Sequence, residues 1–391
     1  MSELTFNQIS TVLKEVYQQA TGKTTLAPVD TNSFIAVATT ALETGYDPVL
    51  KAISQTLSKT IFSNRNYKRK LKSMNVSDIR YGNHVRKLSM VDSDGNFEND
   101  SRQELTDGES IDMYAVNKPK VLQTNFYGQD VYEKSMTIFK DQIDCAISGP
   151  DQFAEFLSMI MTNAKNQIET AHESTARLTL SNYIAGKSVG DVNNVIKLVT
   201  MYNNETGLSL TSETVKQPDN YPTFMRWALA KVMTISDFFT ERTIKFHTNI
   251  AGKEVTRYTP KSLQRLYLYS PEMNNMSTNV LSTTFNDEYL KKIGDYERVN
   301  YWQSIDTPTD INIKPKYMDI DGTLKQPEEN VVLSNVFGVM TDYETLGYNV
   351  TNQWQATTPF NAKGGYSNIF WHFTDRYWND FTENGVIFLL A

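Results

Sequence analysis

The feature that most restricts the fold of this sequence is one very long run with helical periodicity. The run opens with Ser148-Gly149-Pro150-Asp151, where a proline near the first turn and an acid at the positive end of the helix dipole are typical of a helix start. Residues suited to one buried face then recur at spacings of three and four, from Phe153 to Leu178. The pattern predicts a helix over about residues 151–185, about 52 Å long, that ends at Gly186.

A helix of that length needs a partner along its side, because helices in globular proteins average only about 11 to 12 residues. Its apolar packing residues are concentrated toward its start: Phe153, Phe156, Leu157, Ile160, Met161 and Ile168. The stretch Asn163–Arg177 carries a narrow apolar stripe, so we expect it to rest along a sheet or an adjacent subunit. We assign His172 to the polar face of this stretch.

Two adjacent blocks of opposite charge precede the long run. Eight bases stand in the first block, against the single acid Asp78: Arg65, Lys68, Arg69, Lys70, Lys72, Arg80, Arg86 and Lys87. Eight acids stand in the second, against the single base Arg102: Asp92, Asp94, Glu98, Asp100, Glu104, Asp107, Glu109 and Asp112. A segment with such blocks and few apolar residues buries too little surface to fold compactly alone. We expect it to project as a long hairpin or to be ordered by a neighbour.

Opposite charge blocks on one projecting arm offer a route to association between copies. The acidic stretch of one copy can lie on the basic stretch of the next, which makes both blocks candidates for inter-subunit contact. The alternative is a solvated loop whose charges only keep the chain soluble, and the charge pattern alone leaves both possibilities open.

Composition narrows the classes of function. The chain has 391 residues and a formal net charge of -7, which disfavours wholesale binding of nucleic acid by its surface. The single cysteine, Cys145, excludes a disulfide framework and a thiolate metal cluster, and we expect it to be a small buried hydrophobic residue. The start MSELTFNQIS has no signal-peptide pattern, and the apolar run VIFLLA falls short of the roughly 20 residues that span a bilayer. We expect no secretion signal, membrane span, metal or cofactor.

The rest of the chain mixes helical and extended patterns. Further helices are predicted over 4–20, closed by Gly22, over 31–60 with a break near Gly45 and Pro48, over 219–243 and over 273–285. Extended segments are predicted over 121–143, where a strand turns into a helix, and over 263–269, 301–305, 331–340, 343–350 and 366–390. Residues 187–215 are predicted to be loop with short elements. The fold class is therefore α+β.

Three short motifs suggest chemistry, and each has a conformational explanation. Asp319–Leu324 (DIDGTL) matches the nucleophile motif of haloacid-dehalogenase phosphatases, but too little chain follows it for that domain, and an Asp-Gly hairpin tip gives the same letters. Gly22-Lys23-Thr24 and Gly186-Lys187-Ser188 lack the earlier glycine of a phosphate loop, which favours helix ends. Asp92–Asn96 has its glycine at the wrong position for a calcium loop and is better explained as a turn.

The order of parts resembles that of tailed-bacteriophage major capsid (head) proteins of the Hong Kong 97 fold, with phi 29-like podophages closest. Three stretches carry the resemblance: Val121–Lys187 with Phe126-Tyr127-Gly128, Asp141, Asp144 and the helix Phe153–Tyr183; Leu263–Ile305; and Val336–Leu390 with Asp342 and Tyr377-Trp378-Asn379. The resemblance implies an N-arm over 1–64, an extended E-loop hairpin over 65–120, a peripheral domain with the long spine helix over 121–190, a mixed α/β axial domain over 191–335, and C-terminal strands over 336–391 that return to these domains.

The resemblance also implies a function. The chain would be a non-enzymatic major capsid protein that self-assembles, as pentamers and hexamers, into the icosahedral or prolate head shell around a double-stranded DNA genome. Its E-loop would lie across the spine helix of a neighbour, with a scaffolding protein and a portal as further partners, no cofactor and no membrane. It would be assembled in the host bacterial cytoplasm and reside in the virion. Alternatives are a portal or connector, another virion structural protein, an encapsulin-like shell and, from Asp319–Leu324, a phosphatase.

Overall fold

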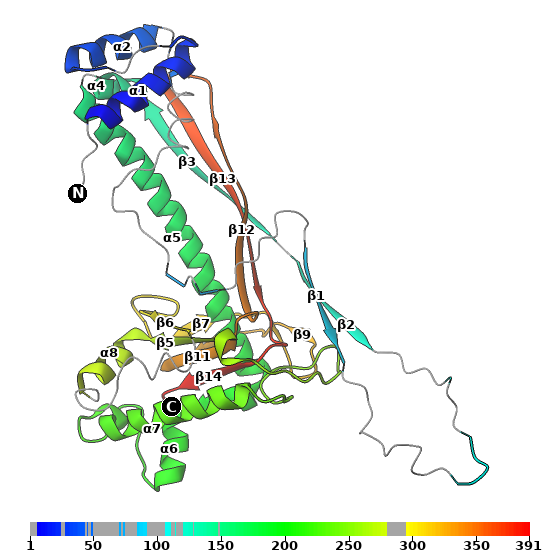
Figure 1. Ribbon diagram of the computed structural model, residues 1–391. Coiled ribbons are helices and arrows are strands. Elements are labelled where there is room, and N and C mark those ends of the chain that lie inside the picture. Colours follow the sequence, from blue (N-terminus) through cyan, green and yellow to red (C-terminus); the bar gives the residue numbers. More distant parts are fainter. Residues whose placement is uncertain are drawn as a thin grey trace. The chain divides into compact units, whose positions relative to one another are not determined.

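The structure is a computed structural model of the chain. This structure describes residues 6–24, 28–43, 45, 48–49, 70–71, 73–74, 84–91, 106–110, 114, 120–127, 129–147, 149–279 and 295–391. The chain forms two compact units. The first unit comprises Met1–Lys72, Gln129–Thr175 and Val350–Arg376, and the second comprises Ser73–Gly128, Ala176–Asn349 and Tyr377–Ala391. Mixed helices and sheets in both units confirm the predicted α+β class (Figure 1).

The predicted long helix is α5, Pro150–Gly190, and its 41 residues make it about 61 Å long. It begins where the proline and acid predict, but the prediction that it ends at Gly186 is wrong. A Cβ on Gly186 would lie 2.8 Å from the Phe381 ring, and a Cβ on Gly190 would lie 2.4 Å from the Met318 carbonyl oxygen. Both glycines therefore allow neighbouring segments to approach α5 closely, and Gly186 does not break it.

The first unit packs helices around the start of α5. Helices α1 (Phe6–Thr21), α2 (Thr31–Glu43) and α4 (Lys140–Ile147) gather there, beside a three-stranded sheet in the order β12-β13-β3 (Figure 1). Its strands are β12 (Leu346–Thr357), β13 (Tyr366–Asn379) and β3 (Asp130–Phe139), and β3 runs antiparallel to β13. The apolar core includes Leu13, Phe34, Phe153, Phe156, Ile160, Ile168, Ile369 and Trp371. The side chains of Leu157 and Met161 lie outside the described ones.

The second unit is built on a five-stranded sheet in the order β4-β14-β11-β5-β6. Its strands are β4 (Val195–Lys197), β14 (Gly385–Leu389), β11 (Val336–Asp342), β5 (Gln264–Tyr269) and β6 (Asp295–Val299). Strand β11 is antiparallel to both β14 and β5, whereas the outer pairs β14–β4 and β5–β6 are parallel.

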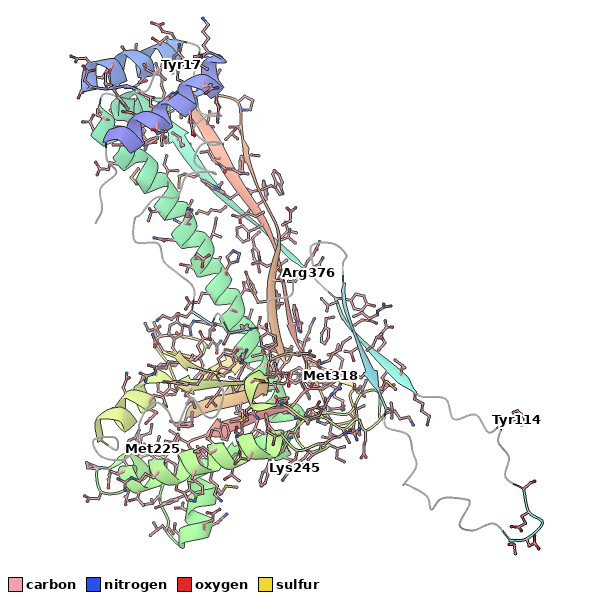
Figure 2. All side chains as sticks on the ribbon, viewed as in Figure 1. Tyr17, Tyr114, Met225, Lys245, Met318 and Arg376 are labelled. Carbon is pink, nitrogen blue, oxygen red and sulfur yellow. The ribbon has the colours of Figure 1, made fainter. Side chains whose placement is uncertain are left out.

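Three helices supply the core of the second unit from one side of this sheet: α6 (Leu198–Thr206), α7 (Tyr221–Phe239) and α8 (Ser270–Asn279). Met225 on α7, labelled in Figure 2, is fully buried, and Leu266, Leu268 and Phe388 of the sheet belong to the same cluster. Gly385 lies on the same strand as Phe388 but faces the opposite side of the sheet, where a Cβ would lie 1.9 Å from the Tyr183 hydroxyl. Close packing of α5 against this strand therefore requires glycine at position 385.

Small elements complete the second unit. They are the 3₁₀ turns η2 (Val192–Asn194), η3 (Thr214–Lys216) and η4 (Lys261–Leu263), the antiparallel pairs β7 (Ile311–Ile313) with β10 (Val331–Leu333) and β8 (Tyr317–Met318) with β9 (Leu324–Lys325), and the hairpin of β1 (His84–Met90) with β2 (Val121–Tyr127). Helix α6 lies within the stretch predicted to be loop with short elements.

Two local predictions are wrong. The extended segment predicted over 301–305 has no strand, and β6 lies immediately before it, at Asp295–Val299. Cys145 is exposed on α4, whereas burial was expected, because its helix turns Ile143 and Ala146 inward instead. The stretch expected to be helical beyond α2 lies largely outside the described residues, as does the calcium-like turn Asp92–Asn96.

The motif Asp319–Leu324 is the hairpin tip that its Asp-Gly letters allow. Strands β8 and β9 pair on either side of it, and Gly322 has a φ of +79°, a conformation that favours glycine. One Asp319 oxygen accepts a hydrogen bond from the Thr323 amide at 2.8 Å, and the other lies 2.5 Å from the Lys325 Nζ. Both oxygens of this carboxylate therefore support the turn.

Candidate functional site

The β1–β2 hairpin has two faces of different character. Seven residue pairs join the strands, from His84 opposite Tyr127 to Met90 opposite Val121. Directly opposed residues of an antiparallel pair share a face. One face, here the outer face, therefore carries Arg86, Leu88, Met90, Val121, Gln123, Asn125 and Tyr127. The other, the inner face, carries Val85, Lys87, Ser89, Leu122, Thr124 and Phe126.

The outer face exposes its apolar side chains. Leu88 is 58% exposed, Met90 63%, Val121 57% and Tyr127 72%. Isolated exposed apolar residues are ordinary, but Leu88, Met90 and Val121 adjoin one another at one end of this face, and Tyr127 lies beyond the Arg86–Asn125 pair. These four residues, called the stripe below, are typical of an interaction site.

The inner face is held by charged side chains of the second unit. The Nζ of Lys87 lies 2.8 Å from Oδ2 of Asp380, 2.5 Å from Oε1 of Glu383 and 3.2 Å from Oε2 of Glu344. Asp380 and Glu383 come from the segment between β13 and β14, and their side chains are only 1% and 8% exposed. One lysine of β1 is thus surrounded by carboxylates distant in sequence.

Arg257 extends this arrangement to a second residue of the inner face. Its guanidinium donates to the Ser89 hydroxyl at 2.8 Å and to the Thr382 carbonyl at 3.2 Å, and its Nε lies 3.2 Å from Oε1 of Glu383. Lys87, Ser89, Arg257, Asp380 and Glu383 are called the Lys87 cluster below. Its two cations face two buried carboxylates, so the charges are balanced within it.

Burial and charge compete in setting the pKa values of the cluster. Burial alone would lower the pKa of Lys87, but the carboxylates of Asp380 and Glu383 raise it above its usual value. Burial likewise opposes ionisation of Asp380, yet the ammonium of Lys87 brings the pKa of that carboxyl below its usual range. Burial, together with the charge of Asp380, raises the pKa of Glu383 to about 7. The ion pair with Asp380 is therefore the firmer of the two.

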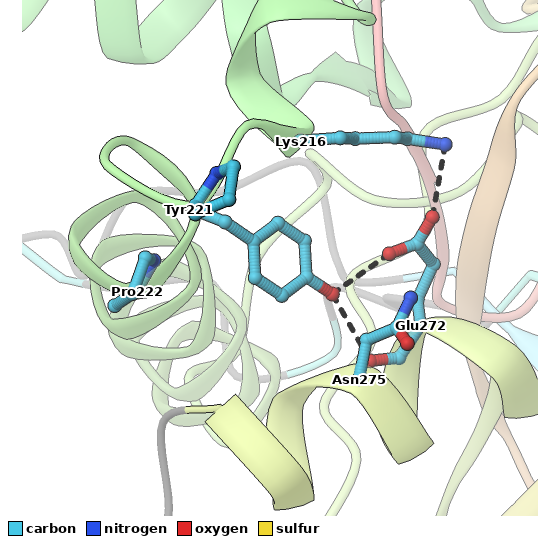
Figure 3. Close-up of a pocket in the computed structure, with 6 residues that line it drawn as sticks. Lys216, Tyr221, Pro222, Glu272 and Asn275 are labelled. Carbon is cyan, nitrogen blue, oxygen red and sulfur yellow. Dashed lines mark hydrogen bonds and ion pairs between the residues drawn. The ribbon is translucent and has the colours of Figure 1, made fainter.

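A pocket of the second unit also combines charged and aromatic groups (Figure 3). It has a volume of about 460 Å³ and is lined by Lys216, Pro218, Tyr221, Pro222, Glu272 and Asn275. The Tyr221 hydroxyl donates to Oε2 of Glu272 at 2.7 Å, and Lys216 Nζ lies 2.9 Å from Oε1. Both oxygens of the buried carboxylate are thus occupied by partners within the pocket, which indicates a structural role.

The structure describes only part of the charged blocks identified in the sequence. Arg86 is exposed on the outer face, Lys87 contacts the acids of the 380–383 segment, and Glu109 accepts hydrogen bonds from Thr106. The backbone amide of Lys70 donates to the Glu173 carboxylate at 3.2 Å. Asp107 is exposed. The remaining candidates, Arg65, Lys68, Arg69, Lys72, Arg80, Asp92, Asp94, Glu98, Asp100, Glu104 and Asp112, lie outside the described residues.

His172 corrects a further expectation. It is buried on α5, its Nδ1 lies 2.9 Å from Oδ2 of Asp375, and its ring meets that of Phe373 edge-on at 5.1 Å. The expected polar face is therefore a buried polar contact with β13. This part of α5 has few apolar residues, so some of its buried positions are polar. A buried polar side chain such as His172 needs a partner, and Asp375 supplies it.

Sequence reasoning did not identify Arg257, Asp380 or Glu383. The sequence does contain a signal for the two acids, because both stand shortly before the apolar run VIFLLA, where burial is expected. Buried carboxylates need cationic partners. Within the described residues, no group of three histidine, cysteine or acidic side chains is placed to hold a metal, and no helix is long and apolar enough to cross a membrane.

Comparison with known proteins identifies a family and two solved structures that this chain resembles. A family model of Phi29-like phage major capsid proteins matches residues 7–389. No curated protein matches the chain. Among solved structures, the chain is similar to one in the capsid structure of Staphylococcus phage Andhra, at 9% identity, with 85% of this chain and 87% of that chain covered and a TM-score of 0.52.

A second similar chain belongs to a structure of the head fiber and inner core protein gp22 of native bacteriophage P68. It has 9% identity, covers 85% of this chain and 87% of that chain, and has a TM-score of 0.53. At such low identities, likeness to these two structures establishes the fold alone.

Proposed function

Because this chain belongs to the family of Phi29-like phage major capsid proteins and forms part of the phage head shell, we propose that its copies join through the outer face of the β1–β2 hairpin. In this proposal, the hairpin of one copy lies on a neighbouring copy, and repetition of this contact between unlike surfaces closes rings. The observation that carries it is the stripe of Leu88, Met90, Val121 and Tyr127.

The β1–β2 hairpin needs a surface to pack against. Two strands alone are marginally stable in water and gain from packing against another surface. The inner face already contacts the second unit, so the outer face is the side left for another copy. Exposed ion pairs contribute only about 0–1 kcal/mol each, so apolar burial, over about 2,000 Å² or more per contact, has to supply most of the affinity.

We further propose the division of parts that the resemblance implies. The N-arm is 1–64, the E-loop is 65–120 with β1–β2 as its base, the peripheral domain is 121–190 with α5 as spine helix, and the axial domain is 191–335. The C-terminal strands over 336–391 return to both domains. The two compact units support this division in the C-terminal part, where the chain passes from the second unit to the first after Asn349 and back after Arg376. They divide the proposed peripheral domain itself at Thr175, within α5.

The finer partners and setting are also proposals. Pentamers and hexamers of this chain form the shell, a scaffolding protein and a portal take part in its assembly in the host cytoplasm, and double-stranded DNA lies inside. The chain has no enzymatic activity in this proposal. Arg65–Lys72 contact DNA or the scaffold, and a hinge near Asn75 or Gly82 lets the E-loop fit both ring sizes. Of these positions, only Lys70 and Leu71 are among the described residues.

Met90→Glu tests the outer face. A carboxylate at this exposed position leaves the subunit folded but places an unpaired charge in the proposed contact, so we expect shells to be lost in electron micrographs while circular dichroism is unchanged. Leu324→Glu is the matched control, because Leu324 is 71% exposed on the separate β8–β9 hairpin and should not affect assembly. Normal shells from Met90→Glu, or twelve-fold rings from the unmodified chain, would contradict the proposal.

A further inference from the structure

Polar side chains connect the β1–β2 hairpin to the rest of the second unit. Among the described residues, the apolar core of that unit draws on α6, α7, α8 and the strands β5, β11 and β14, and it includes none from β1 or β2. The inner face instead makes its close contacts through Lys87 and Ser89, to Asp380, Glu383 and Arg257. Val85, Leu122 and Phe126 of the inner face are half-buried and lie outside this cluster. Because two strands alone are marginally stable, the polar contacts help to set the direction of the hairpin.

The acidic side of the contact is held by hydrogen bonds that do not involve Lys87. Oδ1 of Asp380 accepts hydrogen bonds from the Thr382 amide at 2.9 Å and from its hydroxyl at 2.5 Å, which leaves Oδ2 for Lys87. The backbone of this segment is bonded to the rest of the unit on both sides, through Asp380 N to Thr345 O at 2.8 Å and Gly385 N to Phe246 O at 2.9 Å. The Asp380 carboxylate and the backbone of this segment therefore have little freedom to follow a moving hairpin.

We propose that Lys87 is a positioning residue whose contact with Asp380 and Glu383 acts as a latch, setting the direction of the β1–β2 hairpin and opening without disruption of the apolar core. Loss of Lys87 should disturb the contact strongly, because removing one partner leaves a buried charge uncompensated. It is separable from the core, because the hairpin contributes no residue to that cluster. Its role in assembly rests on the proposed function of the outer face.

The carboxylates that contact Lys87 differ in burial, so they contribute unequally to the latch. Glu344 is 59% exposed, so its ion pair with Lys87 at 3.2 Å is screened by solvent and contributes little. Asp380 and Glu383 are buried and carry the interaction. We therefore expect Glu344→Gln to leave the hairpin as it is and Lys87→Gln to loosen it.

Hydrogen exchange of unassembled subunits tests the latch. Lys87→Gln should speed exchange of the amides in 84–90 and 121–127 by about tenfold or more, while those of β5, β11 and β14 keep their wild-type rates. Arg86→Gln is the matched control: it removes the same charge from the adjacent residue on the opposite face, and wild-type exchange is expected. Lys87→Arg retains the charge and should restore protection to within about threefold of wild type.

Ser89→Ala provides a variant that leaves no buried charge behind. It removes the bond from Arg257 and should speed exchange a few-fold, in the hairpin alone. Wild-type exchange in Lys87→Gln would overturn the latch. Equal acceleration in the hairpin and in the five-stranded sheet would also overturn it, because Lys87 would then stabilise the whole unit. Met90→Glu should keep wild-type exchange whether or not it assembles, so failure of the latch and failure of the proposed function are distinguishable.

Discussion

Glu383 is the residue of the Lys87 cluster whose ionisation responds near neutral pH. Burial and Asp380 raise its pKa from 4.5 to about 7 in the folded chain. The folded state therefore binds more protons than the unfolded state between these values, and the contribution of Glu383 to stability, complete below pH 4.5, is lost as the pH rises through 7. Asp380 changes in the opposite sense, because its lowered pKa contributes stability above its ordinary value of 3.8.

Glu383→Gln removes this titration. The free energy of unfolding of the wild type, minus that of Glu383→Gln, should fall between pH 5 and pH 8, as chemical denaturation at the two pH values would show. An equal difference at both values would show that Glu383 is ionised throughout the range. Glu344→Gln serves as the control, since it removes the exposed carboxylate that also contacts Lys87.

Single residues were the least predictable level from the sequence. Lys87 belongs to a basic block, and nothing in its neighbours distinguishes it from Arg86, although the pleat of β1 sends the two to opposite faces. Its partners lie some 290 positions away. His172 was misplaced for a related reason: helical periodicity marks the apolar stripe but does not reveal that a buried polar group has a partner on another strand.

Elements were more predictable when their pattern was long. The start of α5 followed from Pro150 and Asp151, and most of its length from apolar spacing. Its end did not, because Gly186 and Gly190 serve packing against Phe381 and Met318, which come from elsewhere in the chain. Strand β6 was displaced from its predicted position because the apolar and aromatic residues over 301–305 suggested a strand that tertiary structure does not form.

Gly190→Ala tests the packing explanation for the end of α5. Helix propensity alone would make alanine more stable by about 1 kcal/mol. The new Cβ would lie 2.4 Å from the Met318 carbonyl oxygen, so we expect instead a loss of about 1–3 kcal/mol in the free energy of unfolding, measured by urea denaturation. Val189→Ala, at the exposed neighbouring position, should change stability by about 0.5 kcal/mol or less. A stabilised Gly190→Ala would refute the close approach.

At the scale of the molecule, order and length carried more information than any motif. The succession of charged arm, strand, long helix, mixed subdomain and C-terminal strands resembled the capsid family, and the family match over residues 7–389 confirms it. The phosphatase motif Asp319–Leu324 lies in a hairpin turn. The Lys87 cluster could not be anticipated at this scale, because it depends on how the C-terminal segment returns beside β1.

The central claim is that the outer face of the hairpin contacts a neighbouring copy. A cryo-electron microscopy reconstruction of heads purified from the phage that encodes this chain tests it most directly. We predict that another copy covers Leu88, Met90, Val121 and Tyr127 in both pentamers and hexamers. A shell in which these four side chains face solvent, with the copies joined through other surfaces, would contradict it.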